Sequence, residues 1–171
     1  DSAGAAKVAT AATTLALTVN NVKDAVELTA PTLTTLNLTT AGKDSKIALT
    51  AEAVKTLAVT GDKAADLTGS KLTALTTVTV AGTAGLTLDD KAAAITSINT
   101  TGTTGAVTAT IDGSKATYTG GAGVDTVTLT GAVDLTKAVD LGAGDDSLSF
   151  AALAVKGSTA SFAGGGGADT L

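Results

Sequence analysis

Pairs of apolar residues separated by one polar residue recur along the chain at nearly constant intervals. The first pair begins at Leu15, and its counterparts begin at Leu36, Leu57 and Val78, so the steps are 36 − 15 = 21, 57 − 36 = 21 and 78 − 57 = 21 residues. The same column continues less regularly, with Ile98, then the pair Ala116 and Tyr118 with Ala116 as its first member, then Val139 and Phe162. Internal repetition in this range is typical of solenoid proteins.

Within each repeat, apolar and polar residues alternate, as in Leu36-Asn37-Leu38. This alternation predicts strands with one face directed inward, and the β-branched threonines at the outward positions favour the same structure. Because no single coil can bury a core alone, the coils must stack. The sequence therefore predicts an all-β chain. We expect a right-handed parallel β-helix or β-roll solenoid, a single domain over residues 1–171, with about eight coils of about 21 residues each.

Two alanine-rich segments favour helix by propensity, residues 51–55 and 91–94. Both lie at the phase of the repeat where Pro31 stands in an earlier coil, and proline is tolerated only in the first turn of a helix. We therefore predict that these segments are corners of the solenoid.

A glycine-rich segment, Gly120 to Thr128, matches the nonapeptide G-G-x-G-x-D-x-U-x, where U is a large apolar residue, at every defined position. Partial copies follow at residues 141–149, where Leu141 replaces the first glycine, and at residues 164–171. Such nonapeptides form parallel β-coils that bind Ca²⁺. The alternative is a tight glycine corner whose aspartates only cap turns.

The chemistry of these copies suits calcium. Glycine allows tight turns that direct carbonyl oxygens at an ion, and the aspartate adds a carboxylate. Because Ca²⁺ takes six to eight oxygen ligands, two stacked turns should share each ion, and three copies should form two sites. The candidate ligand positions are Gly121, Gly123, Asp125, Gly142, Gly144, Asp145, Asp146, Gly165, Gly167 and Asp169.

The aspartate of the nonapeptide is mostly absent from earlier coils. Following the glycine corner backwards aligns Asp125 with Val107, then with Thr87 and Asp66. The sequence therefore predicts structural coils over residues 1–115 and Ca²⁺-binding coils over residues 116–171.

The composition narrows the function further. The chain has no cysteine or histidine, its 11 positive charges are all lysine, and the formal net charge is −5. These features argue against thiolate metal sites and against nucleic-acid binding, which normally uses a basic stripe with arginine or stacking aromatics. No apolar run approaches the length of a membrane span, so no membrane insertion is expected.

Two other functions fit the fold less well. Parallel β-helices include polysaccharide-active enzymes, and Asp89-Asp90 resembles an acid pair, but adjacent strand residues point to opposite faces and the chain has no histidine or arginine. Threonine ladders also occur in ice-binding proteins. Here the outward column varies, with Asn37, Ala58, Thr79 and Asn99 at equivalent positions. We therefore expect neither catalysis nor ice binding.

The nonapeptides resemble those of the RTX (repeats-in-toxin) class. The threonine-, alanine- and leucine-rich coils before them, such as residues 56–61 and 75–80, resemble crystalline surface-layer (S-layer) proteins of Gram-negative bacteria. The resemblance implies type I secretion, Ca²⁺-dependent folding at the extracellular cell surface and assembly with identical subunits into a two-dimensional lattice. It also implies attachment to outer-membrane lipopolysaccharide through other parts of a longer chain, of which this sequence is expected to be a piece because Leu171 stops inside a repeat. The alternative is a Ca²⁺-dependent RTX adhesin, in which such coils form a stalk or repeat module.

Overall fold

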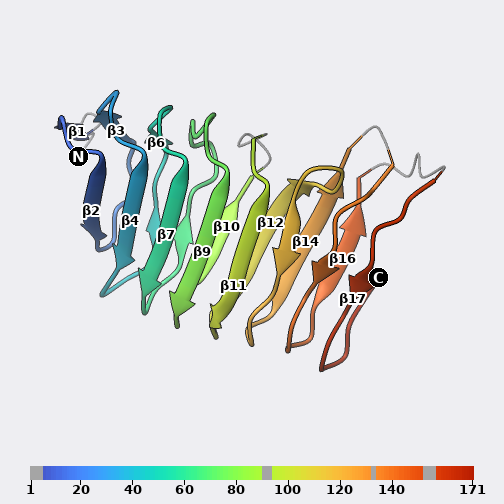
Figure 1. The fold of residues 1–171 in the computed structure, drawn as a ribbon. Helices are drawn as coiled ribbons and strands as arrows, with labels where there is room; N and C mark the ends of the chain where they lie inside the picture. The colour runs from blue at the N-terminus through green and yellow to red at the C-terminus, as the bar shows by residue number, and fades with distance from the viewer. Residues whose placement is uncertain (1–5, 90–93, 132–133, 152–156) are drawn as a thin grey trace.

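The computed structural model describes residues 6–89, 94–131, 134–151 and 157–171. Their strands stack into one parallel β-solenoid, with the N-terminal coils at one end and the C-terminal coils at the other (Figure 1). No α-helix occurs among these residues. The predicted all-β solenoid is therefore confirmed.

The longest sheet has eight parallel strands, one from each successive pass of the chain. Its strands, in chain order, are β2 (Thr14–Val19), β4 (Thr35–Thr40), β7 (Thr56–Gly61), β9 (Thr77–Gly82), β11 (Ser97–Thr103), β13 (Thr117–Thr119), β15 (Val139–Asp140) and β17 (Phe162–Ala163). Leu15, Leu36, Leu57 and Val78 are opposite one another in this sheet. The 21-residue period therefore corresponds to the step from one coil to the next.

Two further sheets close the coil. A six-stranded parallel sheet contains β5 (Ser45–Lys46), β8 (Ala65–Asp66), β10 (Leu86–Leu88), β12 (Val107–Asp112), β14 (Asp125–Thr130) and β16 (Ser147–Phe150). A three-stranded sheet in the N-terminal coils contains β1 (Ala6–Ala9), β3 (Val26–Thr29) and β6 (Leu49–Thr50). Residues 51–55 form a corner without helix, as predicted, whereas most of the second predicted corner lies outside the described residues.

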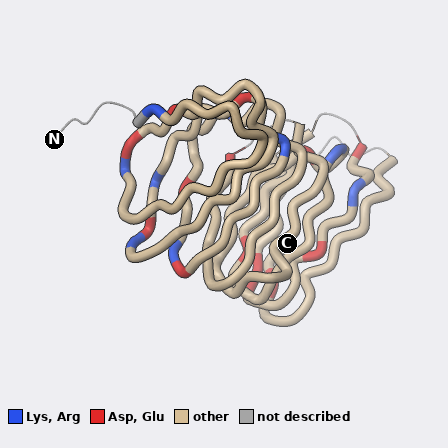
Figure 2. The backbone as a smooth tube through the Cα atoms, turned by 60° about the vertical axis from the view of Figure 1, so that its left-hand side comes forward, with Lys and Arg blue, Asp and Glu red and all other residues tan. Residues whose placement is uncertain are grey.

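The core is a stack of aliphatic columns. Leu36, Leu57, Val78 and Ile98 are all at most 1% exposed, and they alternate along their strands with threonine, serine, asparagine and alanine neighbours that face outward. Charged residues lie mainly at the corners between strands (Figure 2). Within the strands of the eight-stranded sheet, the only charged residue is Asp140.

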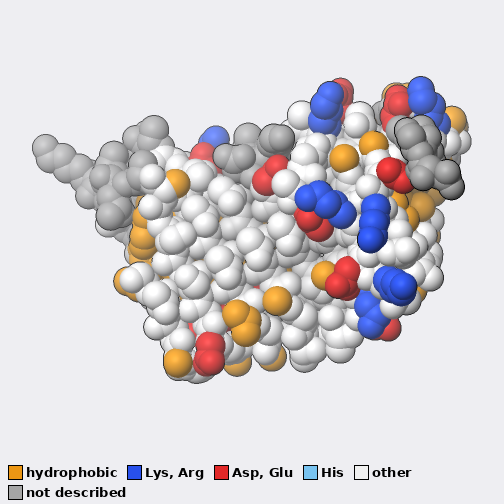
Figure 3. All heavy atoms as spheres, turned by 180° about the vertical axis from the view of Figure 1, so that it is seen from behind, with side chains coloured by type: hydrophobic (Ala, Val, Ile, Leu, Met, Phe, Trp, Pro, Cys, Tyr) orange, Lys and Arg blue, Asp and Glu red, His pale blue; other side chains and the backbone are white. Residues whose placement is uncertain are grey.

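The outer face of the six-stranded sheet changes character along the solenoid. In its N-terminal part, Lys46 and Asp66 form an ion pair of 3.2 Å, whereas the later strands carry threonine and serine at the equivalent position. Charged side chains accordingly gather over the N-terminal coils in a view from behind (Figure 3). Among the described residues, none forms a helix of the length and apolarity that a membrane crossing needs.

The strand register corrects two sequence alignments. Ile98 is opposite Tyr118 rather than Ala116, so the step in this sheet is 118 − 98 = 20 residues. Asp125 is opposite Val107, but the earlier members of its column are Leu86 and Ala65 instead of Thr87 and Asp66. A shift of one residue reverses the face of a strand, so Thr87 and Asp66 point outward.

The aliphatic column gives a direct test of the stacked core. Replacing Leu57, which is fully buried, with alanine should lower the free energy of unfolding by about 2–5 kcal/mol, because the neighbouring coils cannot close the cavity. Leu15 occupies the same column in an end coil and is only partly buried, so Leu15→Ala should cost less. Urea denaturation measures both, and equal losses would contradict a core that is closed by stacking.

Candidate metal centre

The three nonapeptide copies lie directly above one another in the last coils. The Ala143 amide donates to the Gly121 carbonyl (2.8 Å), and the Gly166 amide donates to the Gly142 carbonyl (2.9 Å). Ala143 and Gly166 also form a parallel bridge. The structure therefore brings the predicted glycine positions together at one corner, between the eight-stranded and six-stranded sheets.

The aspartates of the three copies form a column at the start of the six-stranded sheet. The Val107 amide donates to Asp125 Oδ1 (3.3 Å), and the Asp125 amide donates to Asp146 Oδ1 (2.7 Å). The Asp146 amide donates in turn to Asp169 Oδ1 (3.1 Å). Each carboxylate therefore binds the backbone of the preceding coil, which fixes the coils relative to one another.

Asp146 has one oxygen without a hydrogen-bond partner. Its side chain is 1% exposed, and Oδ2 is buried and accepts no hydrogen bond from any residue that the structure describes. A buried charged oxygen without a partner costs several kcal/mol in the folded state unless a cation or a proton compensates it. Among the described residues, this oxygen is the one best placed to accept a cation.

Asp125 is equally buried but is fully hydrogen-bonded. Its Oδ2 accepts a hydrogen bond from the Tyr118 hydroxyl (2.9 Å), and that hydroxyl also lies 3.4 Å from Thr100 Oγ1. Sequence reasoning placed Tyr118 in a strand column and assigned it no role. One sequence feature could have indicated a role for Tyr118: it is the single tyrosine of the chain, and it replaces an aliphatic residue seven positions before an aspartate.

The surroundings of the aspartate column shift the pKa values of Asp125, Asp146 and Tyr118. Burial raises the pKa of Asp125 above its ordinary value, and the nearby charge of Asp146 raises it further. Burial also raises the pKa of Asp146, as do the charges of Asp169 and Asp145. Burial raises the pKa of Tyr118 well above its usual range, so its hydroxyl stays protonated and donates to Asp125.

The close approach of neighbouring coils explains why these corner positions are glycine. A Cβ on Gly144 would stand 2.5 Å from the Gly123 carbonyl oxygen, and one on Gly121 would overlap the carbonyls of Thr100 and Thr103. Gly142 and Gly144 have φ of +91° and +147°, and their counterparts Gly165 and Gly167 have +93° and +137°. The second and third copies therefore share a backbone conformation, which the first copy does not adopt because neither Gly121 nor Gly123 has such a φ.

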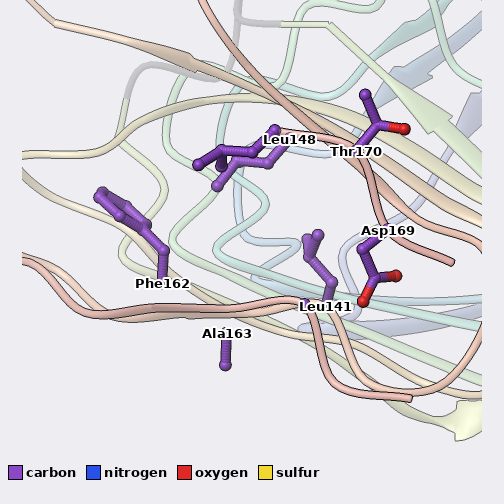
Figure 4. Close-up of a pocket in the computed structure, with 8 residues that line it drawn as sticks. Leu141, Leu148, Phe162, Ala163, Asp169 and Thr170 are labelled. Carbon is purple, nitrogen blue, oxygen red and sulfur yellow. The ribbon is translucent and has the colours of Figure 1, made fainter. Parts of the chain in front are cut away.

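The remaining two aspartates are more exposed. Asp145 Oδ1 accepts a hydrogen bond from the Ala168 amide (2.9 Å), so it joins the second and third copies. Asp169 lies at the rim of a hollow lined by Leu141, Leu148 and Phe162, where the apolar core opens at the last coil (Figure 4). Both side chains are reachable from solvent next to the buried Asp146.

The donor set fits a hard cation at Asp146. The corner offers only oxygen donors, which Ca²⁺ prefers, including one spare buried carboxylate oxygen. No group of three or more acidic, histidine or cysteine side chains among the described residues is arranged to hold a metal. Glycine carbonyls would therefore have to complete the coordination. Asp125 offers a poorer fit because hydrogen bonds occupy both of its oxygens.

Comparisons with protein-family models, with curated proteins and with solved structures find no match for this chain. A β-solenoid fold is compatible with a structural or repeat module, and the chain's more specific role depends on its own residues. Asp89, the described half of the acid pair, accepts a hydrogen bond from the Gly69 amide (3.0 Å), whereas Asp90 lies outside the described residues.

Proposed function

We propose that the chain is part of a structural subunit of a bacterial surface layer. In this proposal it is a Ca²⁺-stabilised solenoid that assembles with identical copies into a two-dimensional lattice outside the cell. The observation that carries the calcium part is the buried, unpartnered Oδ2 of Asp146 within a stacked column of aspartates. The glycine nonapeptides around it support the same proposal.

The residues of the corner have distinct roles in this proposal. Asp146 holds the preceding coil through Oδ1 and presents Oδ2 to the ion, while Asp145 and Asp169 add negative charge nearby. A bound Ca²⁺ would supply the positive charge that this corner lacks. Without it, mutual repulsion of the carboxylates keeps the last coils loosely held, which suits a chain exported before it folds.

The outer surface supports the lattice part of the proposal. The strands of the eight-stranded sheet present mainly threonine, asparagine and alanine outward, with Asp140 as their only charge. A face with so few charges can pack against another copy at little cost from burying unpaired charges.

A calcium titration tests the site. We expect the wild-type chain to bind Ca²⁺ saturably in calorimetry and to gain β-structure in circular dichroism as it does so. Asp146→Asn should lower the affinity for Ca²⁺ at least tenfold and reduce the gain of β-structure at a given Ca²⁺ concentration. Asp62→Asn is the matched control, because Asp62 is an exposed aspartate at the same corner of an earlier coil that lacks the column. Complete folding in chelator without Ca²⁺ binding would contradict the calcium part of the proposal.

Electron microscopy separates the surface layer from the adhesin. A surface-layer subunit should form ordered two-dimensional arrays when Ca²⁺ is returned to chelated protein, and these arrays should disperse again in chelator. An RTX adhesin stalk would bind Ca²⁺ and become more stable while remaining monomeric under the same conditions.

A further inference from the structure

The same structural relationship recurs in the last three coils. An inward-facing residue of the eight-stranded sheet stands seven positions before the aspartate of the column: Tyr118 before Asp125, Val139 before Asp146, and Phe162 before Asp169. Tyr118, Val139 and Phe162 are opposite one another in the sheet, as are successive aspartates in the other. Each coil therefore contains one such pair across its glycine corner.

Only the first of these pairs contains a hydrogen-bond donor. The Tyr118 hydroxyl reaches Asp125 Oδ2 at 2.9 Å. In the next coil, Val139 has no polar atom in its side chain, and Asp146 Oδ2 is the buried oxygen left without a partner. Tyrosine at this position therefore satisfies the oxygen that is unsatisfied where valine stands.

The glycine corners beside Asp125 and Asp146 also differ, in their backbone conformation. Gly121 and Gly123, beside Asp125, lie outside the left-handed backbone region, whereas Gly142 and Gly144, beside Asp146, lie in it. The complete nonapeptide thus has a different corner from the two partial copies. Its backbone conformation and its hydrogen bonding both separate it from them.

We propose that Tyr118 takes the place of a metal ion at Asp125, so that the metal-dependent part of the solenoid begins one coil later, at Asp146. This inference rests on the proposed calcium function and deepens it. At Asp125 protein groups alone satisfy the carboxylate, through the phenol of the same coil and the Val107 amide of the preceding coil. Tyr118 is thus a positioning residue at the boundary between metal-free and metal-bound coils.

The first test compares the two buried aspartates in the full chain by calorimetric titration with Ca²⁺. Asp146→Asn should remove one bound ion per chain, whereas Asp125→Asn should leave the number of bound ions unchanged. Loss of an ion from Asp125→Asn would overturn the inference while leaving the calcium function intact. Absence of Ca²⁺ binding to the wild-type chain would instead overturn the proposed function on which the inference rests.

The second test removes only the phenol oxygen. Tyr118→Phe should lower the melting temperature in chelator by roughly 3–12 °C, because a buried charged hydrogen bond is lost. In Ca²⁺ the loss should largely disappear and one additional ion should bind. Equal losses in both buffers with an unchanged number of ions would overturn the inference. Thr100→Val, which removes the other neighbour of the phenol, is the control and should not change the number of ions.

Discussion

Replacing Gly144 with alanine should destabilise the solenoid by about 3 kcal/mol or more. Its φ of +147° is one that residues with a side chain rarely adopt, and the new Cβ would stand 2.5 Å from the Gly123 carbonyl oxygen of the preceding coil. It would also stand 3.0 Å from Asp146 Oδ1, the oxygen that binds the Asp125 amide. Relief of these contacts requires the coils to move apart at the aspartate column. Urea denaturation in chelator measures this loss in the free energy of unfolding separately from any effect of the substitution on calcium binding.

Two other glycines separate the causes of this loss. Gly69 has φ of +83° but no atom within 4 Å of its Cβ position, so Gly69→Ala should cost only the backbone strain, about 1 kcal/mol. Gly166 has neither feature and is the counterpart of Ala143, so Gly166→Ala should change stability by less than about 0.5 kcal/mol. If Gly144→Ala cost no more than Gly69→Ala, close packing of the corner would be refuted.

The repeat itself made the fold predictable from sequence. Leu36, Leu57 and Val78 recur at one interval because each coil must place the same side chain above the last, and strand register adds no further freedom. The stacking of Asp125 and Asp146 follows from the same interval. Periodicity therefore determines which residues lie above one another wherever the coil length is constant.

Coil length is not constant near the candidate site, and there sequence reasoning was wrong. The step from Val107 to Asp125 is 125 − 107 = 18 residues, whereas the step from Ile98 to Tyr118 in the facing sheet is 20. Corners absorb the difference, so an alignment carried from one sheet to the other shifts by one or two residues. This is why Ala116 was aligned with Ile98, and Thr87 and Asp66 with Asp125.

The hydrogen bond between Tyr118 and Asp125 could not be predicted for a related reason. It crosses the coil from one sheet to the other, and its length depends on how the glycine corner bends. The nonapeptide pattern fixes the types of residue along the corner but not its backbone conformation. The first copy matches the pattern at every defined position, yet it lacks the glycine φ values that the other two copies share.

The pH dependence of stability should reverse between chelator and calcium. Asp125 and Asp146 have folded-state pKa values raised above 3.8 by burial, so the folded chain binds more protons than the unfolded chain between that value and the raised ones. Their contribution to stability is therefore complete below pH 3.8 and is lost as pH rises through the folded pKa. In chelator, the free energy of unfolding should accordingly increase as pH falls from neutrality to about pH 4.

Other carboxylates set the lower limit of this range. Burial alone would raise the pKa of Asp66 and of Asp112, but hydrogen bonds from Thr68 and Ser114 and the nearby Lys46 and Lys115 lower both below 3.8. Their contribution is present above 3.8 and is lost as pH falls through the lowered values. Stability in chelator should therefore pass through a maximum at about pH 4 and decline below it.

In saturating calcium the carboxylate of Asp146 must be ionised to bind the ion, so protons and Ca²⁺ compete for it. Stabilisation by the ion, about 2.7 kcal/mol per site at a free concentration one hundred times the dissociation constant, should fade as pH falls toward 4. Melting temperatures measured by circular dichroism across this range, in chelator and in calcium, should therefore converge at low pH. Asp146→Asn should flatten both profiles, whereas Asp62→Asn should follow the wild type. A chelated chain whose stability fell steadily from neutral pH to pH 4 would contradict the raised pKa values, because acid would then be breaking favourable contacts of carboxylates instead of relieving unfavourable burial.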